Sequence, residues 1–118
     1  MLLVVGECVL GELDPQCVRM ATGLAGGLGD TQQEMCGALN GGVLVIGGLL
    51  GRESLSESDA PAFALAVRYR ERFLAEFGCT QCGRLRDKVV YAPGGLGSCG
   101  ALVERAATVL LDLLAEAE

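Results

Sequence analysis

The chain has 118 residues, which is enough for one domain with a continuous apolar core and leaves no room for a second. Its 9 Lys and Arg against 15 Asp and Glu give a net charge of −6, which disfavours nucleic acid and membrane surfaces as partners. Histidine is absent, and this excludes Ser-His-Asp and Cys-His catalysis and histidine-ligated zinc.

The first predicted elements are short helices. Residues 2–5 would make a lone strand without a partner, so the end of a helix is expected there instead. Asp14 followed by Pro15 predicts the start of the next helix, with the carboxylate as its cap. Four glycines lie between Gly23 and Gly29, and they predict a turn whose backbone N–H groups approach a neighbouring group closely.

A buried, glycine-rich central helix is predicted over residues 35–51, because this run is almost wholly apolar with helical spacing. Thr31 and Glu34 have the spacing of a capping box before it. The run has 17 residues, six of them glycine, which is short for a membrane span, so no span is expected. Gly37 and Gly41 share one face and would let another helix or a cluster come close.

Two amphipathic helices are predicted in the second half of the chain. The first follows Asp59 and Pro61 and ends at Gly78. Its expected apolar face is Phe63, Ala66, Val67, Phe73, Leu74 and Phe77. The second is capped by Ser98, with an apolar face made by Cys99, Leu102, Val103, Ala106, Leu110, Leu113 and Leu114.

The segment between these two helices is expected to be irregular, apart from a short helical turn over residues 82–87. Together the patterns predict an all-α fold: a single domain over residues 1–118, built as a bundle of about four to five helices around the glycine-rich central one.

Six cysteines lie at positions 8, 17, 36, 79, 82 and 99, without the dense spacing of a secreted disulfide scaffold. The N-terminus has neither the basic region nor the cleavage site of a signal peptide. We therefore expect thiols or metal thiolates in a reducing cytoplasm. At Cys8 and Cys17 the simplest interpretation is a small buried hydrophobic side chain.

Several thiols are predicted near helix starts, where unpaired N–H groups and the helix dipole favour the thiolate. Cys17, Cys36 and Cys99 have this placement, with the effect strongest at Cys99 and weakest at Cys36. Cys79 and Cys82 form a CxxC pair, but a helix precedes it, which disfavours a thioredoxin-like fold.

Without histidine, converging thiolates select zinc or an iron–sulfur cluster. Sulfurs could converge at Cys36, Cys82 and Cys99, with Cys79 adjacent, since each lies at a helix start or a loop edge next to glycine. The same residues would equally suit a dithiol redox pair.

The segment from Cys36 to Gly41, CGALNG, has the pattern CGAxxG and resembles the C-GCAxxG-C-C family, whose members are described as redox-active. The likeness extends to residues 14–29, to the run 73–78 ahead of Cys82, and to Cys99 with the final amphipathic helix. It covers nearly the whole chain.

The resemblance implies a helical protein with four characteristic cysteines that have a redox or metal function, often encoded near oxidoreductase or transporter genes. Three of the four correspond to Cys36, Cys82 and Cys99. The family's first cysteine would fall at or just before Met1, so the chain is expected to lack the family's most N-terminal segment. Cys8 or Cys79 could take its place.

The leading interpretation is a thiol-based redox or electron-transfer accessory protein whose Cys36, Cys82 and Cys99 bind an iron–sulfur cluster or another metal such as zinc. One alternative is a dithiol–disulfide oxidoreductase. Another is a non-catalytic helical subunit of an oxidoreductase or transporter assembly, with a redox or transporter protein as partner and a homo-oligomeric state. Cys79, Cys8 and Cys17 are secondary candidates, and Gly37 and Gly41 are the motif glycines.

Overall fold

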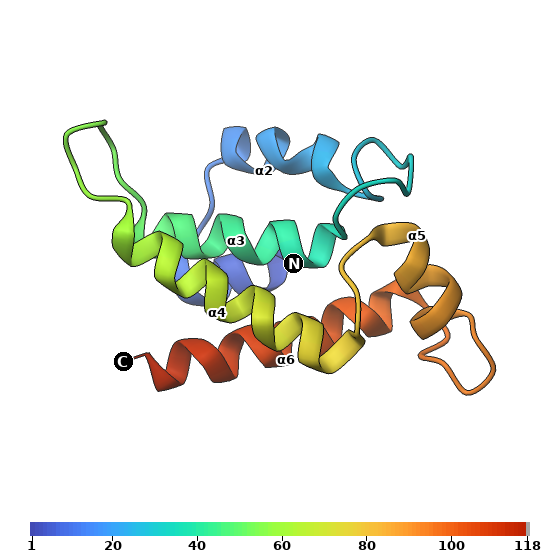
Figure 1. Ribbon diagram of the computed structural model, residues 1–118. Coiled ribbons are helices and arrows are strands. Elements are labelled where there is room, and N and C mark those ends of the chain that lie inside the picture. Colours follow the sequence, from blue (N-terminus) through green and yellow to red (C-terminus); the bar gives the residue numbers. More distant parts are fainter. Residues whose placement is uncertain (118) are drawn as a thin grey trace.

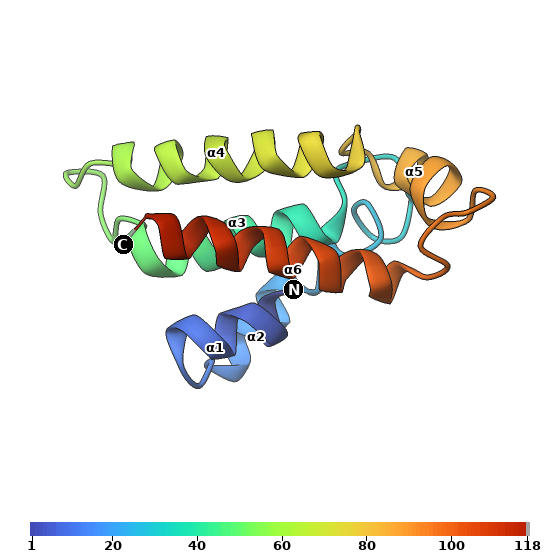
Figure 2. The ribbon, with the colours of Figure 1, turned by 90° about the horizontal axis from the view of Figure 1, so that it is seen from below.

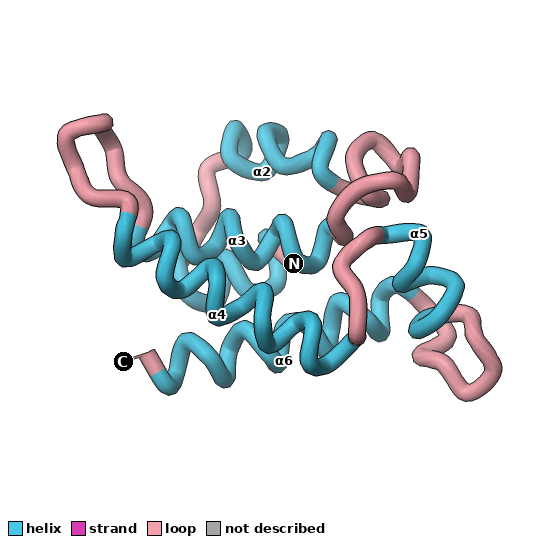
Figure 3. The backbone as a smooth tube through the Cα atoms, viewed as in Figure 1, coloured by secondary structure: helices cyan, strands magenta, loops and turns pink. Residues whose placement is uncertain are grey.

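The structure, a computed structural model, describes residues 1–117. Over these residues it contains six α-helices and no β-strand, which confirms the all-α prediction (Figures 1 and 3). The α-helices are α1 Glu7–Leu10, α2 Pro15–Ala21, α3 Gly37–Leu50, α4 Ala60–Phe77, α5 Cys82–Leu85 and α6 Cys99–Glu116. Shorter helical segments are η1 Leu2–Gly6 and η3 Arg86–Val90, both π-helical, and the 3-10 turn η2 Thr22–Leu24.

The three longest helices, α3, α4 and α6, lie against one another and run along the molecule (Figure 2). The N-terminal elements η1 and α1 contact α3, and they lie with α2 on the side of α3 away from α4. α5 and η3 gather at the end of the molecule where α3 and α6 begin (Figure 1). The start of α3, the start of α6 and the α5–η3 segment are therefore neighbours.

The core lies between α3, α4 and α6. Its fully buried larger side chains are Tyr69, Phe73, Leu39, Ile46, Leu85, Leu110, Leu113, Val5, Val45 and Val90. The hydroxyl of Tyr69 donates a hydrogen bond of 2.9 Å to the carbonyl oxygen of Ala38. Its ring lies against the backbone of α3, because Gly42 has no Cβ there; an added Cβ would lie 2.3 Å from Tyr69 Cε2.

Helix α3 is buried along one face and not all round. Its buried residues are Ala38, Leu39, Gly41, Gly42, Val45 and Ile46. On the other side Val43, Leu44, Leu49 and Leu50 are 38–41% exposed. The expected buried central helix is thus partly open to solvent along its outer face.

The predicted caps at Asp14, Ser98, Gly78 and Asp59 all lie where expected. The Asp14 carboxylate accepts from the N–H of Gln16 at 2.8 Å, and the Ser98 hydroxyl accepts from that of Ala101 at 3.1 Å. Gly78 ends α4 with φ of +82°. Asp59 occupies the cap position of α4 but makes no capping hydrogen bond; the Ser58 hydroxyl accepts from the N–H of Ala60 instead.

The predicted capping box before α3 is wrong. The Thr31 hydroxyl donates to the carbonyl oxygen of Gly27 at 2.7 Å and so belongs to the preceding loop. α3 begins at Gly37, and its capping residue is Cys36.

The apolar face of α4 is only partly as predicted. Phe73 and Phe77 are buried, but Phe63 and Val67 are 63% and 53% exposed. The buried residues are Leu65, Tyr69, Phe73 and Phe77, which recur every four residues and form one stripe toward α3 and α6.

Among residues 1–117, no helix is both long and apolar enough to span a membrane. The most apolar of the longer helices, α3, has 14 residues.

Candidate functional site

A cavity of about 420 Å³ lies where the start of α3 meets α5, η3, α6 and the N-terminal segments. Most of its lining is apolar. The side chains that face it come from η1, α2, η2, α3, α5, η3 and α6, so it is built from nearly every part of the chain.

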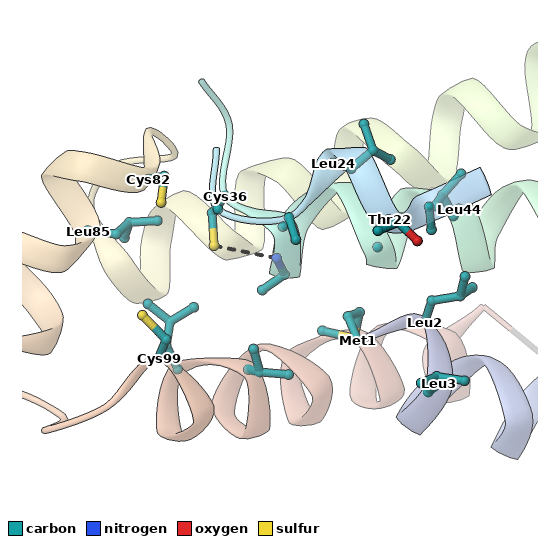
Figure 4. A pocket seen from close by; sticks show the side chains of 18 of the residues that line it. Met1, Leu2, Leu3, Thr22, Leu24, Cys36, Leu44, Cys82, Leu85 and Cys99 are labelled. Carbon is teal, nitrogen blue, oxygen red and sulfur yellow. Dashed lines mark hydrogen bonds between the residues drawn. The ribbon is translucent and has the colours of Figure 1, made fainter. Parts of the chain in front are cut away.

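Three thiols line this cavity: Cys36, Cys82 and Cys99. They come from the cap of α3, the first residue of α5 and the first residue of α6. Figure 4 shows the three sulfurs together at one end of the cavity, with Leu85 beside them. The structure therefore brings together the three cysteines that the sequence singled out.

The loop between η2 and α3 has an unusual backbone. Several of its residues have φ between +58° and +71°, the left-handed region that costs a non-glycine residue of order 1–3 kcal/mol. These residues are Gly26, Gly27, Leu28, Gly29, Asp30 and Gln32. The four-glycine prediction of a tight turn is thereby confirmed, and three non-glycine residues adopt the same strained geometry.

This left-handed loop holds Cys36 next to Cys82. The N–H of Cys36 donates to the carbonyl oxygen of Thr80 at 2.8 Å, and the N–H of Cys82 donates to that of Glu34 at the same distance. Between them Met35 and Gln81 form an isolated antiparallel bridge. The two thiols are thus fixed on adjacent stretches of backbone.

Glycine makes this approach possible at one position in particular. A Cβ added to Gly27 would lie 2.6 Å from Cys82 Cβ and 2.9 Å from the Cα of Gln32. The loop backbone therefore lies directly against the Cys82 side chain, where any larger residue would push the thiol away.

Cys36 caps α3 with its sulfur. Its Sγ accepts a hydrogen bond from the N–H of Ala38, with a separation of 3.4 Å. Burial raises the pKa of this thiol, while hydrogen bonds from the N–H groups of Ala38 and Leu39 act in the opposite direction; the neighbouring Cys82 and Cys99 raise it further. At Cys36, burial outweighs the helix N-terminus, so the thiol keeps its proton at neutral pH.

Arg86 adds a cation to the thiol end of the cavity. The charge of Cys99 raises the pKa of this guanidinium most, and Cys82 and Asp30 raise it too. The guanidinium of Arg86 therefore lies close to the sulfurs of both Cys99 and Cys82. Its Nε is buried without a hydrogen-bond partner, and its terminal NH2 lies 3.6 Å from the Asp30 carboxylate.

Sequence reasoning did not single out Arg86. The signal that could have found it is its spacing from Cys82: in a helical segment, residues four apart lie on the same face. α5 and η3 follow one another without a break, and they carry the two residues into the same cavity.

The remaining cysteines lie apart from the three-thiol end. Cys79 lines a separate hollow with Leu74, Gly78, Thr80, Gln81 and Arg84. Cys8 and Cys17 are exposed and line neither hollow, which corrects the interpretation of them as buried hydrophobic side chains.

The two motif glycines allow other segments of the chain to lie close to the backbone of α3. A Cβ added to Gly41 would lie 2.8 Å from the Cβ of Met1, and one added to Gly37 would lie 3.4 Å from the Cα of Ala25. Both glycines line the cavity, as does Met1.

All six cysteines are free thiols. In the described part of the chain, no three Cys, Asp or Glu side chains gather closely enough to hold a metal ion. As the side chains stand, the three thiols share a cavity without forming a finished metal site.

A family model described as "Putative redox-active protein (C_GCAxxG_C_C)" matches residues 1–113, which include all three thiols of the cavity. No curated protein and no solved structure matches the chain.

Proposed function

Because this chain belongs to the C-GCAxxG-C-C family of redox-active proteins, we propose that it is a thiol-based redox protein whose site is Cys36, Cys82 and Cys99. The observation that carries this proposal is the meeting of three thiols from distant segments at one cavity, beside a single arginine. The attacking form of a thiol is the thiolate, and a neighbouring cation stabilises it.

The three thiols differ in a way that suits different roles. Cys99 is half-buried, at the first position of α6, beside Arg86. Cys82 is buried, also beside Arg86, and Cys36 keeps its proton. Cys99 is therefore the thiol that attacks, Cys82 the one that resolves, and Cys36 a protonated neighbour.

The reaction with a substrate disulfide R–S–S–R balances as follows. The Cys99 thiolate attacks one sulfur, and a first R–S⁻ leaves as a mixed disulfide forms. The Cys82 thiolate then attacks the Cys99 sulfur, which closes the Cys82–Cys99 disulfide and releases the second R–S⁻. The protein loses two electrons, the substrate gains them, and the two protons of the cysteines pass through solvent to the two released thiols.

A second candidate is an iron–sulfur or zinc site on the same three residues. It is favoured by the donor chemistry, since thiolates select these soft metals and three of them line one cavity. The side chains would have to move closer together, and a fourth ligand would be needed, because such centres commonly take four.

The test is to purify the protein without oxygen, to measure its iron, zinc and acid-labile sulfide, and then to titrate it against a thiol–disulfide buffer. Mass spectrometry of the oxidised protein should show a reversible Cys82–Cys99 disulfide that Cys99→Ser abolishes. Cys8→Ser and Cys17→Ser are matched controls, since both thiols are exposed and lie outside the cavity.

Metal in a fixed ratio to protein, lost when all three cavity cysteines are replaced, would favour the second candidate. A protein that contains no metal and forms no reversible disulfide would overturn both candidate functions.

The proposal includes a reducing cytoplasm as the setting, supported by the six free thiols. It includes a redox or transporter protein as partner as well. It also includes a homo-oligomer, supported by apolar side chains that remain exposed on α3 and α4, namely Val43, Leu49, Leu50, Phe63 and Val67. Light scattering before and after alkylation of the thiols tests the oligomer: a monomer in both states would contradict it.

A further inference from the structure

The cavity is larger than the three thiols need. Figure 4 shows the sulfurs at one end, while Leu2, Leu3, Thr22 and Leu44 lie toward the other. Apart from the hydroxyl of Thr22, the side chains that Figure 4 labels at this second end are hydrocarbon. A volume of about 420 Å³ lies in the range of small-molecule sites, which are mostly apolar with a few polar groups in fixed positions.

Within residues 1–117, the cavity has no negatively charged side chain in its lining. Among the lining residues that the structure describes, Arg86 carries the only charged side chain, and the α-amino group of Met1 also lies at the cavity, near Cys36. Its nearest carboxylate, Asp30, is 3.6 Å away and 76% exposed, so that ion pair is weak. The buried Nε of Arg86 has no hydrogen-bond partner, although Cys82 lies within hydrogen-bonding reach of the guanidinium. A buried donor without a partner is costly, and an anionic group placed there would satisfy it.

We propose that this cavity binds a small amphipathic anion, with its apolar part against Leu44 and Leu2 and its one negative group at Arg86. The inference rests on the proposed function in one respect. A molecule bound in this cavity lies against the three thiols, so its chemical class is the class of the redox substrate. A positively charged ligand would be repelled by the guanidinium of Arg86. A molecule with several charges would leave some of them unpaired against hydrocarbon.

The test uses octanoate, octan-1-ol and octylammonium as probes, which share an eight-carbon chain and differ in charge. Each is titrated into the reduced protein without oxygen, and the NMR shifts of the Leu and Val methyl groups give both the affinity and the place of binding. Octanoate should bind about tenfold more tightly than octan-1-ol, because of a charge-assisted hydrogen bond to Arg86. Octylammonium should bind more weakly than either.

Two pairs of variants locate the effect. Arg86→Gln should abolish the preference for octanoate over octan-1-ol, whereas Arg84→Gln, an exposed arginine outside this cavity, should retain it. Leu44→Gln should weaken all three probes. Leu49→Gln, on the same helix and equally exposed at 40% against 39%, should leave them unchanged.

The proposal is overturned if octanoate does not shift the cavity methyl groups, if octylammonium binds as tightly, or if Leu49→Gln weakens binding as much as Leu44→Gln does. Failure here leaves the redox assignment intact, because the Cys82–Cys99 disulfide is measured separately. Conversely, octanoate that binds a protein with no reversible disulfide and no metal would support the cavity and overturn the redox function.

Discussion

The carbonyl oxygen of Glu34 accepts a hydrogen bond of 2.8 Å from the N–H of Cys82. This bond joins the left-handed loop to the first residue of α5, and with the bond from Cys36 to Thr80 it fixes two of the three cavity thiols. The site therefore depends on the loop as much as on the cysteines themselves.

The first prediction concerns Gly27 in this loop. Gly27→Ala should lower the free energy of unfolding by about 2–4 kcal/mol, from left-handed strain and a clash with Cys82. Gly29→Ala is the matched control, because Gly29 has nearly the same φ, +61° against +70°, but an added Cβ meets nothing within 4 Å. It should cost only about 1 kcal/mol. Urea denaturation measures both, and equal losses would contradict the proposed contact with Cys82.

The second prediction concerns the pH dependence of stability. Because burial raises the pKa of the Cys36 thiol, the folded state holds this proton more tightly than the unfolded state does. The resulting stability is fully present below about pH 8.5, the ordinary thiol value, and is lost as the pH rises toward the higher pKa of the folded state.

Cys36→Ser should therefore make stability less sensitive to pH above this value, while serine still caps α3. Cys17→Ser, at an exposed thiol, should follow the wild-type curve. Urea midpoints from pH 7 to 10 test the difference. Parallel curves for wild type and Cys36→Ser would show that Cys36 does not carry this effect.

The third prediction concerns the buried hydroxyl of Tyr69. Tyr69→Phe removes the hydrogen bond to the Ala38 carbonyl and should cost about 1 kcal/mol. Tyr91→Phe is the control, since Tyr91 is 62% exposed, and its effect should lie within about 0.5 kcal/mol of zero. Thermal unfolding compares the two variants, and a loss of the same size in each would speak against a buried bond.

The fourth prediction separates two glycines of the same helix. Gly42→Ala should destabilise by about 1–3 kcal/mol, since its Cβ would overlap the Tyr69 ring. Gly47→Ala should stabilise by about 0.5–1 kcal/mol, because an added Cβ there meets nothing within 4 Å and alanine favours helix. Chemical denaturation of both variants should give opposite signs. Two losses of equal size would contradict the tight contact between α3 and α4.

Local sequence signals predicted the helix ends that depend on local chemistry. Asp14 with Pro15, Ser98 and Gly78 act within a few residues of themselves, and each lies where expected. The cap of α3 was missed for the opposite reason. Cys36 is held by a hydrogen bond to Thr80, and Thr31 is used inside a left-handed loop, so neither contact follows from neighbouring residues.

The same distinction applies to packing and to the site. Phe63 and Val67 fit a helical apolar stripe as well as Leu65 and Tyr69 do, and the choice between the two stripes is made by α3 and α6. The cysteines could be singled out because thiols are few and chemically distinct. Arg86 was missed because an arginine in a helix is most often solvated, and its spacing of four residues from Cys82 does not by itself show that both face one cavity.

The three cavity thiols come from residues 36, 82 and 99. Because they are far apart in the sequence, they leave the ribosome at different times during synthesis. During synthesis on the ribosome, Cys36 emerges while α5 and α6 do not yet exist, so nothing shields its thiol from oxidants or from capture by other molecules. The left-handed loop cannot be clamped by Thr80 until much later. The three-thiol end of the cavity is thus among the last parts of the molecule to be completed, and its thiols must still be reduced when α6 has been synthesised.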